Sequence, residues 1–395
     1  MPASPSTARA INDRLALRLL QQEGPLTAGQ LKQLTGLSRP TVADLVERLT
    51  AAGLISVVGE SGEQRRGPNA RLYGIVADRA HLAALDVRTE GVSVVVSDLL
   101  GTELARASVP IADDTGTGPA VEQAVTLVER AAKEAGAERL HTVGIGAPGL
   151  IDPGTGELRD SSGLPEWHRR LVAALQERLP ARVLVENETN LAALAEQRDG
   201  AARDRDTFVL LWLGHGTGAA VILDGRLRRG ASGGTGEIGF LPVPGTSTLP
   251  SATDCEGGFH SLAGAAAVAG LAARYGVVAE PVPHEPHAAA LVRAAVSTPD
   301  APDSSRFLDA LADRLAVGAA SVIAVLDPGC VVLGGEVGRA GGDVLAARVE
   351  QRLVRMSPLP TKVRASALGG GAVLRGALLT ARDGAQDELF APPSR

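Results

Sequence analysis

The 395-residue sequence predicts an α/β protein in two unequal parts. Residues 1–78 carry three helical patterns followed by two β-prone runs, whereas residues 79–386 alternate strands with helices and repeat one order of strands. Charge divides at the same place: the first part holds nine Lys/Arg against seven Asp/Glu, and the remainder 30 against 38. We therefore expect a weakly basic helical head on a larger, acidic body.

The first two helices of the head are marked by spacing and by a capping pattern. Ile11, Leu15 and Leu19 recur every four residues, which predicts an initial helix. Thr27 and Gln30 stand three residues apart, where the hydroxyl and the amide can satisfy free backbone N–H groups in a capping box. A short second helix is expected from there to residue 34, before the turn at residues 35–36.

The third helix of the head should begin after Ser38, a good N-cap, with Pro40 in its first turn, where the missing N–H does no harm. Four apolar side chains then share one helical face: Val42, Leu45, Val46 and Leu49. The face left outside carries Arg39, Thr41, Ala43, Asp44 and Arg48. This face is available for contacts outside the head.

Two β-prone runs at residues 54–58 and 71–75, joined by residues 60–70, complete a winged helix-turn-helix. In such domains the second helix of the motif enters the DNA major groove, and arginines on a wing contact phosphates or the minor groove. A single weakly basic head binds DNA feebly, so a homodimer or tetramer reading paired half-sites of double-stranded operator DNA is expected. The candidate DNA-binding residues are Ser38, Arg39, Thr41, Arg48, Arg65, Arg66 and Asn69.

Composition excludes several other classes. The longest apolar run, near residues 262–273, is too short to span a bilayer, and arginines interrupt residues 1–20 where a signal peptide needs an apolar core. We expect a cytoplasmic protein without membrane contact. Cys255 and Cys330 are too few for a disulfide framework or a cysteine-rich zinc site.

The body shows an internal duplication. The first half has three strands, a helix and a strand, followed by a second helix and strand. Three strands in the same order then recur. In both sets the second and third strands are joined by a turn with Asp and Gly, at residues 98–101 and 224–225. Such halves fit the two-lobed actin-like, ribonuclease-H-like architecture, whose ligands lie between the lobes. The expected elements are residues 82–86, 92–98, 103–109, 120–135, 142–146, 166–179, 182–186, 208–213, 218–223 and 226–228.

Four segments of this body resemble the ROK family of repressors and sugar kinases: residues 143–152, 186–190, 225–239 and 332–335. The resemblance covers nearly the whole chain, because many ROK regulators carry an N-terminal winged helix-turn-helix. It implies a DNA-binding domain (1–78), a ROK N-terminal lobe (79–187) and a C-terminal lobe (188–386) whose final helix can pack back on the first lobe. Residues 387–395, by their composition, are expected to be a flexible tail.

The sequence departs from the ROK kinases where they handle phosphate. Their Asp-x-Gly-Gly-Thr loop is replaced by Asp86-Val87-Arg88-Thr89-Glu90, which adds side chains and a negative charge where a cradle of backbone N–H groups is needed. Glu188 stands in place of the family's catalytic Asp, and a displacement of about 1 Å can lower a rate on the order of a hundredfold. We therefore expect no catalytic residue and no cofactor.

The family's zinc and sugar sites are also reduced. Phe240 replaces the usual histidine, and the downstream stretch keeps only Cys255 and His260, short of four zinc ligands. No metal site is expected. Phe240 can stack on a sugar or pack in the core. The remaining candidate ligand-binding residues are Pro148, Gly149, Asn187, Glu188 and Glu237.

The leading hypothesis is a ROK-type transcriptional repressor in which a carbohydrate or related metabolite, bound between the lobes, changes DNA affinity. Two alternatives remain open. One is an ATP-dependent sugar kinase with a DNA-binding arm. The other is a ligand-independent DNA-binding protein that uses the kinase-like body only as a dimerisation scaffold.

Overall fold

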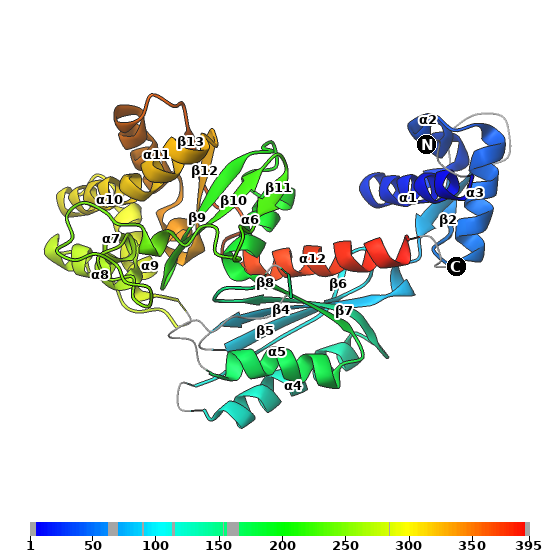
Figure 1. Cartoon of the computed structure of the whole chain (residues 1–395), viewed down its shortest axis with the longest axis horizontal. Helices are drawn as coiled ribbons and strands as arrows, with labels where there is room; N and C mark the ends of the chain where they lie inside the picture. The colour runs from blue at the N-terminus through cyan, green and yellow to red at the C-terminus, as the bar shows by residue number, and fades with distance from the viewer. Residues whose placement is uncertain are drawn as a thin grey trace.

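A small N-terminal head and a body of two lobes make up the computed structural model, which describes residues 5–61, 70–88, 91–112, 115–152, 154–155, 166–283 and 285–391 (Figure 1). The last helix of the chain runs along the body and ends beside the head (Figure 1). No helix in the described ranges combines the length and apolar character that crossing a membrane requires.

The head has the predicted three helices and hairpin. Thr27 Oγ1 accepts a hydrogen bond from Gln30 N (3.2 Å) and Thr27 N donates to Gln30 Oε1 (2.8 Å), so the capping box is confirmed. The four apolar side chains predicted on one face of the third helix are all buried. The elements are α1 (Pro5–Glu23), β1 (Leu26–Thr27), α2 (Ala28–Thr35), α3 (Arg39–Ala51), β2 (Ile55–Ser61) and β3 (Ala70–Ile75), and the sheet order is β1-β3-β2.

The buried face of α1 differs from the predicted one. Ile11 is 58% exposed and Leu15 39% exposed, whereas Ala16, Leu17 and Leu20 are buried. The four-residue spacing correctly identified a helix, but apolar residues occur on more than one of its faces. Packing against α2, α3 and β3 selects the face that is buried.

The N-terminal lobe is a five-stranded sheet in the order β6-β5-β4-β7-β8. Helices α4 and α5 cover one face, while α12 packs against β4 and β7 on the other. β7 pairs parallel with β4, and β8 pairs parallel with β7. The elements are η1 (Ala77–Arg79), β4 (His81–Arg88), β5 (Gly91–Ser97), β6 (Glu103–Pro110), α4 (Thr117–Glu134), β7 (Leu140–Ala147), α5 (Glu166–Arg178) and β8 (Arg182–Asn187).

The C-terminal lobe repeats this topology, with the sheet order β11-β10-β9-β12-β13. The two orders correspond strand for strand, so the predicted duplication is confirmed. Its further elements are α6 (Glu188–Asp199), β9 (Phe208–Leu213), β10 (Thr217–Leu223), β11 (Arg226–Arg228), η2 (Ile238–Phe240), α7 (His260–Ala263), α8 (Ala265–Arg274), α9 (His287–Ser297), α10 (Pro302–Leu326), β12 (Cys330–Gly334), α11 (Gly335–Met356), β13 (Lys362–Ala365) and η3 (Gly369–Gly371).

Helix α12 (Ala372–Leu389) follows η3 and lies against α6, β4 and β7. Glycines allow this close approach, because a Cβ on Gly144 would overlap the carbonyl of Ala377, and one on Gly376 the carbonyl of Leu191. The flexible tail expected from residue 387 is wrong for its first residues, since the helix continues and Phe390 is buried. Residues 392–395 lie outside the described part of the chain.

Candidate functional site

The start of α3 presents polar groups at the surface of the head. Ser38 caps the helix, with its Oγ accepting from Thr41 N (3.3 Å) and lying 2.8 Å from Thr41 Oγ1. Ser38 and Arg39 are exposed, and Arg39 makes no ion pair with any described residue. The hydroxyls of Ser38 and Thr41 and the guanidinium group of Arg39 therefore lie in the first turn of α3. In helix-turn-helix complexes the N-terminal end of this helix approaches the bases.

Arg48, another predicted DNA contact, is occupied inside the head. Its Nη2 lies 2.5 Å from Asp13 Oδ1 on α1, and its Nη1 bonds Asp44 one turn earlier on α3. The hydrogen bond to Asp13 raises the pKa of the guanidinium group. Arg48 therefore joins α1 to α3 and neutralises Asp44 on the exposed face.

The predicted wing contacts Arg65, Arg66 and Asn69 fall outside the described residues. The strands that flank them pair antiparallel from Ile55 with Ile75 to Ser61 with Ala70. A shift of register between Val57 and Gly59 interrupts this pairing.

Glu186 organises the loops at the carboxyl ends of β7 and β8. Its buried carboxylate accepts from Asn187 N (3.0 Å) and Asn190 Nδ2 (2.9 Å) through Oε1, and from Arg229 Nε (2.6 Å) through Oε2. Arg229 belongs to the segment that leads to Glu237, so this carboxylate ties the start of α6 to the C-terminal lobe. Sequence reasoning missed Glu186 and Arg229, although both stand in segments that carry the family resemblance.

The amide of Asn187 is largely used within the protein. Oδ1 caps α6 by accepting from Thr189 N (2.9 Å) and Asn190 N (3.3 Å), and Nδ2 donates to the carbonyl of Gly149 (3.0 Å). Gly149 adopts a positive φ of 98°, which places its carbonyl at this amide. Asn187 thus fixes the Pro148–Gly149 turn, and only its second amide hydrogen remains for an outside partner.

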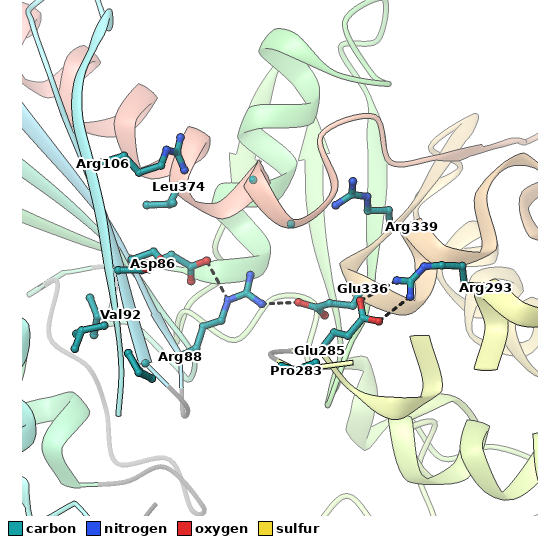
Figure 2. Close-up of a pocket in the computed structure, with 17 residues that line it drawn as sticks. Asp86, Arg88, Val92, Arg106, Pro283, Glu285, Arg293, Glu336, Arg339 and Leu374 are labelled. Carbon is teal, nitrogen blue, oxygen red and sulfur yellow. Dashed lines mark hydrogen bonds and ion pairs between the residues drawn. The ribbon is translucent and has the colours of Figure 1, made fainter. Parts of the chain in front are cut away.

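Arg88 spans the two lobes at the end of β4. Its Nε lies 3.0 Å from Asp86 Oδ2, and its Nη1 lies 2.6 Å from Glu336 Oε1 at the start of α11 (Figure 2). Although burial opposes its charge, Asp86, Glu336 and Glu188 together raise the pKa of Arg88. Glu188 therefore lies in the field of this arginine.

A cavity of about 580 Å³ surrounds this ion pair between the lobes (Figure 2). Glu336 lines this cavity and lies against the loop joining β9 and β10, where a Cβ on Gly214 would lie 2.7 Å from Glu336 Oε2. The glycine of that loop thus makes room for a carboxylate. Thr89 and Glu90, predicted to replace the glycines of a phosphate loop, lie outside the described residues.

His168 on α5 supports the backbone of Arg88. It is buried, and its Nε2 lies 3.2 Å from the carbonyl oxygen of Arg88, which can only accept, so Nε2 carries the proton. Burial lowers the pKa of His168, which favours the neutral ring. The Trp167 ring packs edge-on against the His168 ring, with 4.1 Å between the ring centroids.

Glu237, Phe240, Cys255 and His260 lie on the C-terminal lobe. Glu237 reaches the surface, but surrounding protein raises the pKa of its carboxyl by desolvation. Burial likewise lowers the pKa of His260 and raises that of Cys255. Phe240 is 36% exposed, which leaves part of its ring for an outside partner. Among the described residues, no three His, Cys, Asp or Glu side chains gather in a group able to hold a metal ion.

A winged helix-turn-helix head joined to two lobes of the same strand order defines a two-lobed, actin-like architecture with an added N-terminal domain. The chain belongs to the ROK family, whose profile matches residues 82–383, and a MarR family profile matches residues 11–67. The predicted fold class, a two-lobed ROK body with an N-terminal winged helix-turn-helix, is confirmed.

Individual relatives include both regulators and enzymes. The DNA-binding transcriptional dual regulator NagC of Escherichia coli is 28% identical over 243 residues, covering 60% of this chain and 58% of NagC. A glucokinase of Thermotoga maritima is 30% identical over 227 residues, covering 54% and 68%. The crystal structure of a ROK family transcriptional regulator, a homologue of E. coli MLC, superposes with a TM-score of 0.77 at 22% identity, covering 97% and 98%.

Proposed function

We propose that this protein is a DNA-binding transcriptional repressor whose affinity for its operator is changed by a sugar or related metabolite bound between the lobes. The observation that carries the proposal is the Asp86–Arg88–Glu336 ion-pair cluster, which places two carboxylates in the interlobe cavity at the loop expected to hold phosphate in a ROK kinase, while the head keeps an exposed α3 N-terminus. NagC and a xylose repressor of Bacillus subtilis, 24% identical, support the regulatory class. The match spans 58% of NagC.

The proposal does not include catalysis. A nucleotide phosphate is stabilised by concentrated positive partial charge, and the carboxylates of Glu336 and Glu188 oppose that arrangement. Arg88 offsets their charge but engages both Asp86 and Glu336. We therefore assign Glu188 to ligand contact together with Glu237, and Asn187 to positioning of the Pro148–Gly149 turn.

DNA recognition is tested by substitutions in the head. Arg39→Ala should weaken binding to the operator by about 1–3 kcal/mol, whereas Arg65→Ala should weaken binding to all sequences and flatten the salt dependence. Arg306→Ala, on an exposed arginine of the body, serves as the matched control. Footprinting and titration on operator and random duplexes measure these effects, and equal losses for Arg39→Ala on both duplexes would contradict the assignment of α3.

Ligand control is tested by titrating the DNA complex with a panel of hexoses, hexosamines and their N-acetyl derivatives. One sugar should change the operator affinity by about 1–3 kcal/mol, typical of coupling between two sites. Asn187→Ala and Glu237→Ala should reduce that response without changing DNA affinity in the absence of sugar. If no sugar in the panel changes the affinity, the sugar-effector hypothesis fails, and the ligand-independent scaffold becomes the favoured alternative.

A sugar kinase is the second candidate, favoured by the similarity to the T. maritima glucokinase. Coupled ADP release with the same sugars discriminates it. Turnover that disappears in Glu188→Gln would replace the repressor proposal with a kinase that carries a DNA-binding arm.

A further inference from the structure

A second cavity, of about 520 Å³, lies at the junction of the head with the body. Its walls come from α1 of the head and from α6 and α12 of the body, and it shares no lining residue with the interlobe cavity. Gln386 Nε2 on α12 crosses the junction, donating to Gln21 Oε1 (2.9 Å) and to the carbonyl of Leu99 (3.1 Å). The cavity is therefore built by both parts of the molecule.

The lining of this cavity carries more positive than negative side chains, although the net charge of the chain is −6. Two carboxylates, Asp383 and Asp387, face four guanidinium groups. Asp387 pairs with the head and Asp383 with α6 (2.7 Å to the Arg198 Nη2). The lining arginines are Arg14, Arg18, Arg198 and Arg382.

Two of the four cations remain without a full partner. Arg18 is exposed and makes no ion pair with any described residue. The side chain of Arg382 is only 14% exposed, its Nη2 lies 3.8 Å from Asp383, and its buried Nε has no hydrogen-bond partner within the described residues. Burial lowers the pKa of Arg382. The charges of Asp383 and Asp199 oppose this effect, and those of Arg198 and Arg375 add to it.

A buried guanidinium N–H without an acceptor is costly, and several like charges around one cavity add to that cost. An anion in the cavity would relieve both. Phosphoryl oxygens match the planar fork of guanidinium donors, and a dianion supplies one charge for each of the two incompletely paired arginines. The volume exceeds what one phosphate group fills and suits a small organic molecule.

We propose that the cavity between α1, α6 and α12 binds a small phosphorylated metabolite carrying at least two negative charges, held by Arg18 of the head and Arg382 of the body. Because the two arginines belong to different parts of the molecule, a bound anion links the head to the body. This site is separate from the proposed sugar site, and the proposal does not depend on the identity of the operator.

The test is calorimetric titration of the full chain with inorganic pyrophosphate at fixed ionic strength. We expect one saturable site per chain, weakened at least tenfold by Arg18→Gln and by Arg382→Gln. Arg170→Gln, on an exposed arginine of α5 paired with Glu166, is the control and should bind as the unmodified protein does. Arg18 is exposed, so its substitution tests the site even if Arg382→Gln impairs folding.

Three outcomes would overturn the proposal. Absence of saturable binding removes the site, and equal binding by all variants places the anion elsewhere. Equal heats with chloride at matched ionic strength reduce the effect to general screening. Random duplex DNA provides a further arm: if it displaces pyrophosphate from the unmodified protein and binds Arg18→Gln and Arg382→Gln more weakly, the cavity receives the DNA backbone instead of a metabolite.

Discussion

Arg88 gives the sharpest expectation about the body, because its ion pair with Glu336 joins residues 248 positions apart in the sequence. Arg88→Met keeps most of the side-chain volume and removes the charge. Asp86 and Glu336, whose side chains are 5% and 13% exposed, then lose their shared cation. Removing one partner of a buried pair costs about 3–5 kcal/mol, and because Arg88 is itself 26% exposed we expect about 3 kcal/mol.

The assay is thermal and denaturant unfolding, followed by a double-mutant cycle with Glu336→Gln. A loss of about 3 kcal/mol should lower the melting temperature by roughly 6–12 °C for a unit of this size. The coupling energy between the two positions should exceed about 1 kcal/mol. Arg306→Met, which removes an exposed pair with Asp303, is the control and should cost less than about 1 kcal/mol.

The direction of the pH response adds an independent check. Carboxylates that lose their cation have raised pKa values in the folded state, so the deficit of Arg88→Met should shrink as the pH falls toward the pKa range of carboxyl groups. A melting temperature equal to that of the unmodified protein, or a coupling energy of zero, would refute the view that Arg88 holds the lobes together.

Two further expectations concern α5 and α12. Because burial lowers the folded-state pKa of His168, the unfolded chain binds its proton first, so the protein should lose stability as the pH falls below about 6.5. His168→Gln, which keeps an N–H donor, should reduce that loss in melting experiments between pH 7 and pH 5, and an identical pH profile would disprove the role. Gly376→Ala should destabilise α12 by about 1–3 kcal/mol because its Cβ would overlap the Leu191 carbonyl, whereas Gly371→Ala meets no atom within 4 Å and should be nearly neutral; equal melting of the two variants would contradict the close packing.

The helices of the head could be predicted from the sequence because their signals are local. The capping box at Thr27 and Gln30, the cap at Ser38 and the apolar face of α3 depend on residues within a few positions of one another, so their geometry follows from helix periodicity. Arg48 shows the limit of that reasoning. Its position on the outer face predicted a DNA contact, but its main partner is Asp13, 35 residues earlier, which only the packing of α1 on α3 brings near.

The same limit applies to the site between the lobes. The residue types at Asn187 and Glu188 indicated a ligand site, yet the α6 cap and the Gly149 carbonyl occupy most of the amide. No local pattern around Arg88 predicts its ion pair with Glu336, and none around Arg382 predicts that Arg18 lines the same cavity. These pairs depend on how α11, α12 and α1 are placed by the sheets.

The sequence by itself determined the element order, the duplicated strand topology, the winged helix-turn-helix and the ROK family, because these depend on local periodicity, caps and contiguous motifs. The tertiary structure decided which charges meet: Arg88 with Glu336 across the lobes, Arg48 with Asp13 in the head, and four arginines around the junction cavity. Electrostatic partners are selected by distance in space, and that distance is fixed only when helices and sheets pack.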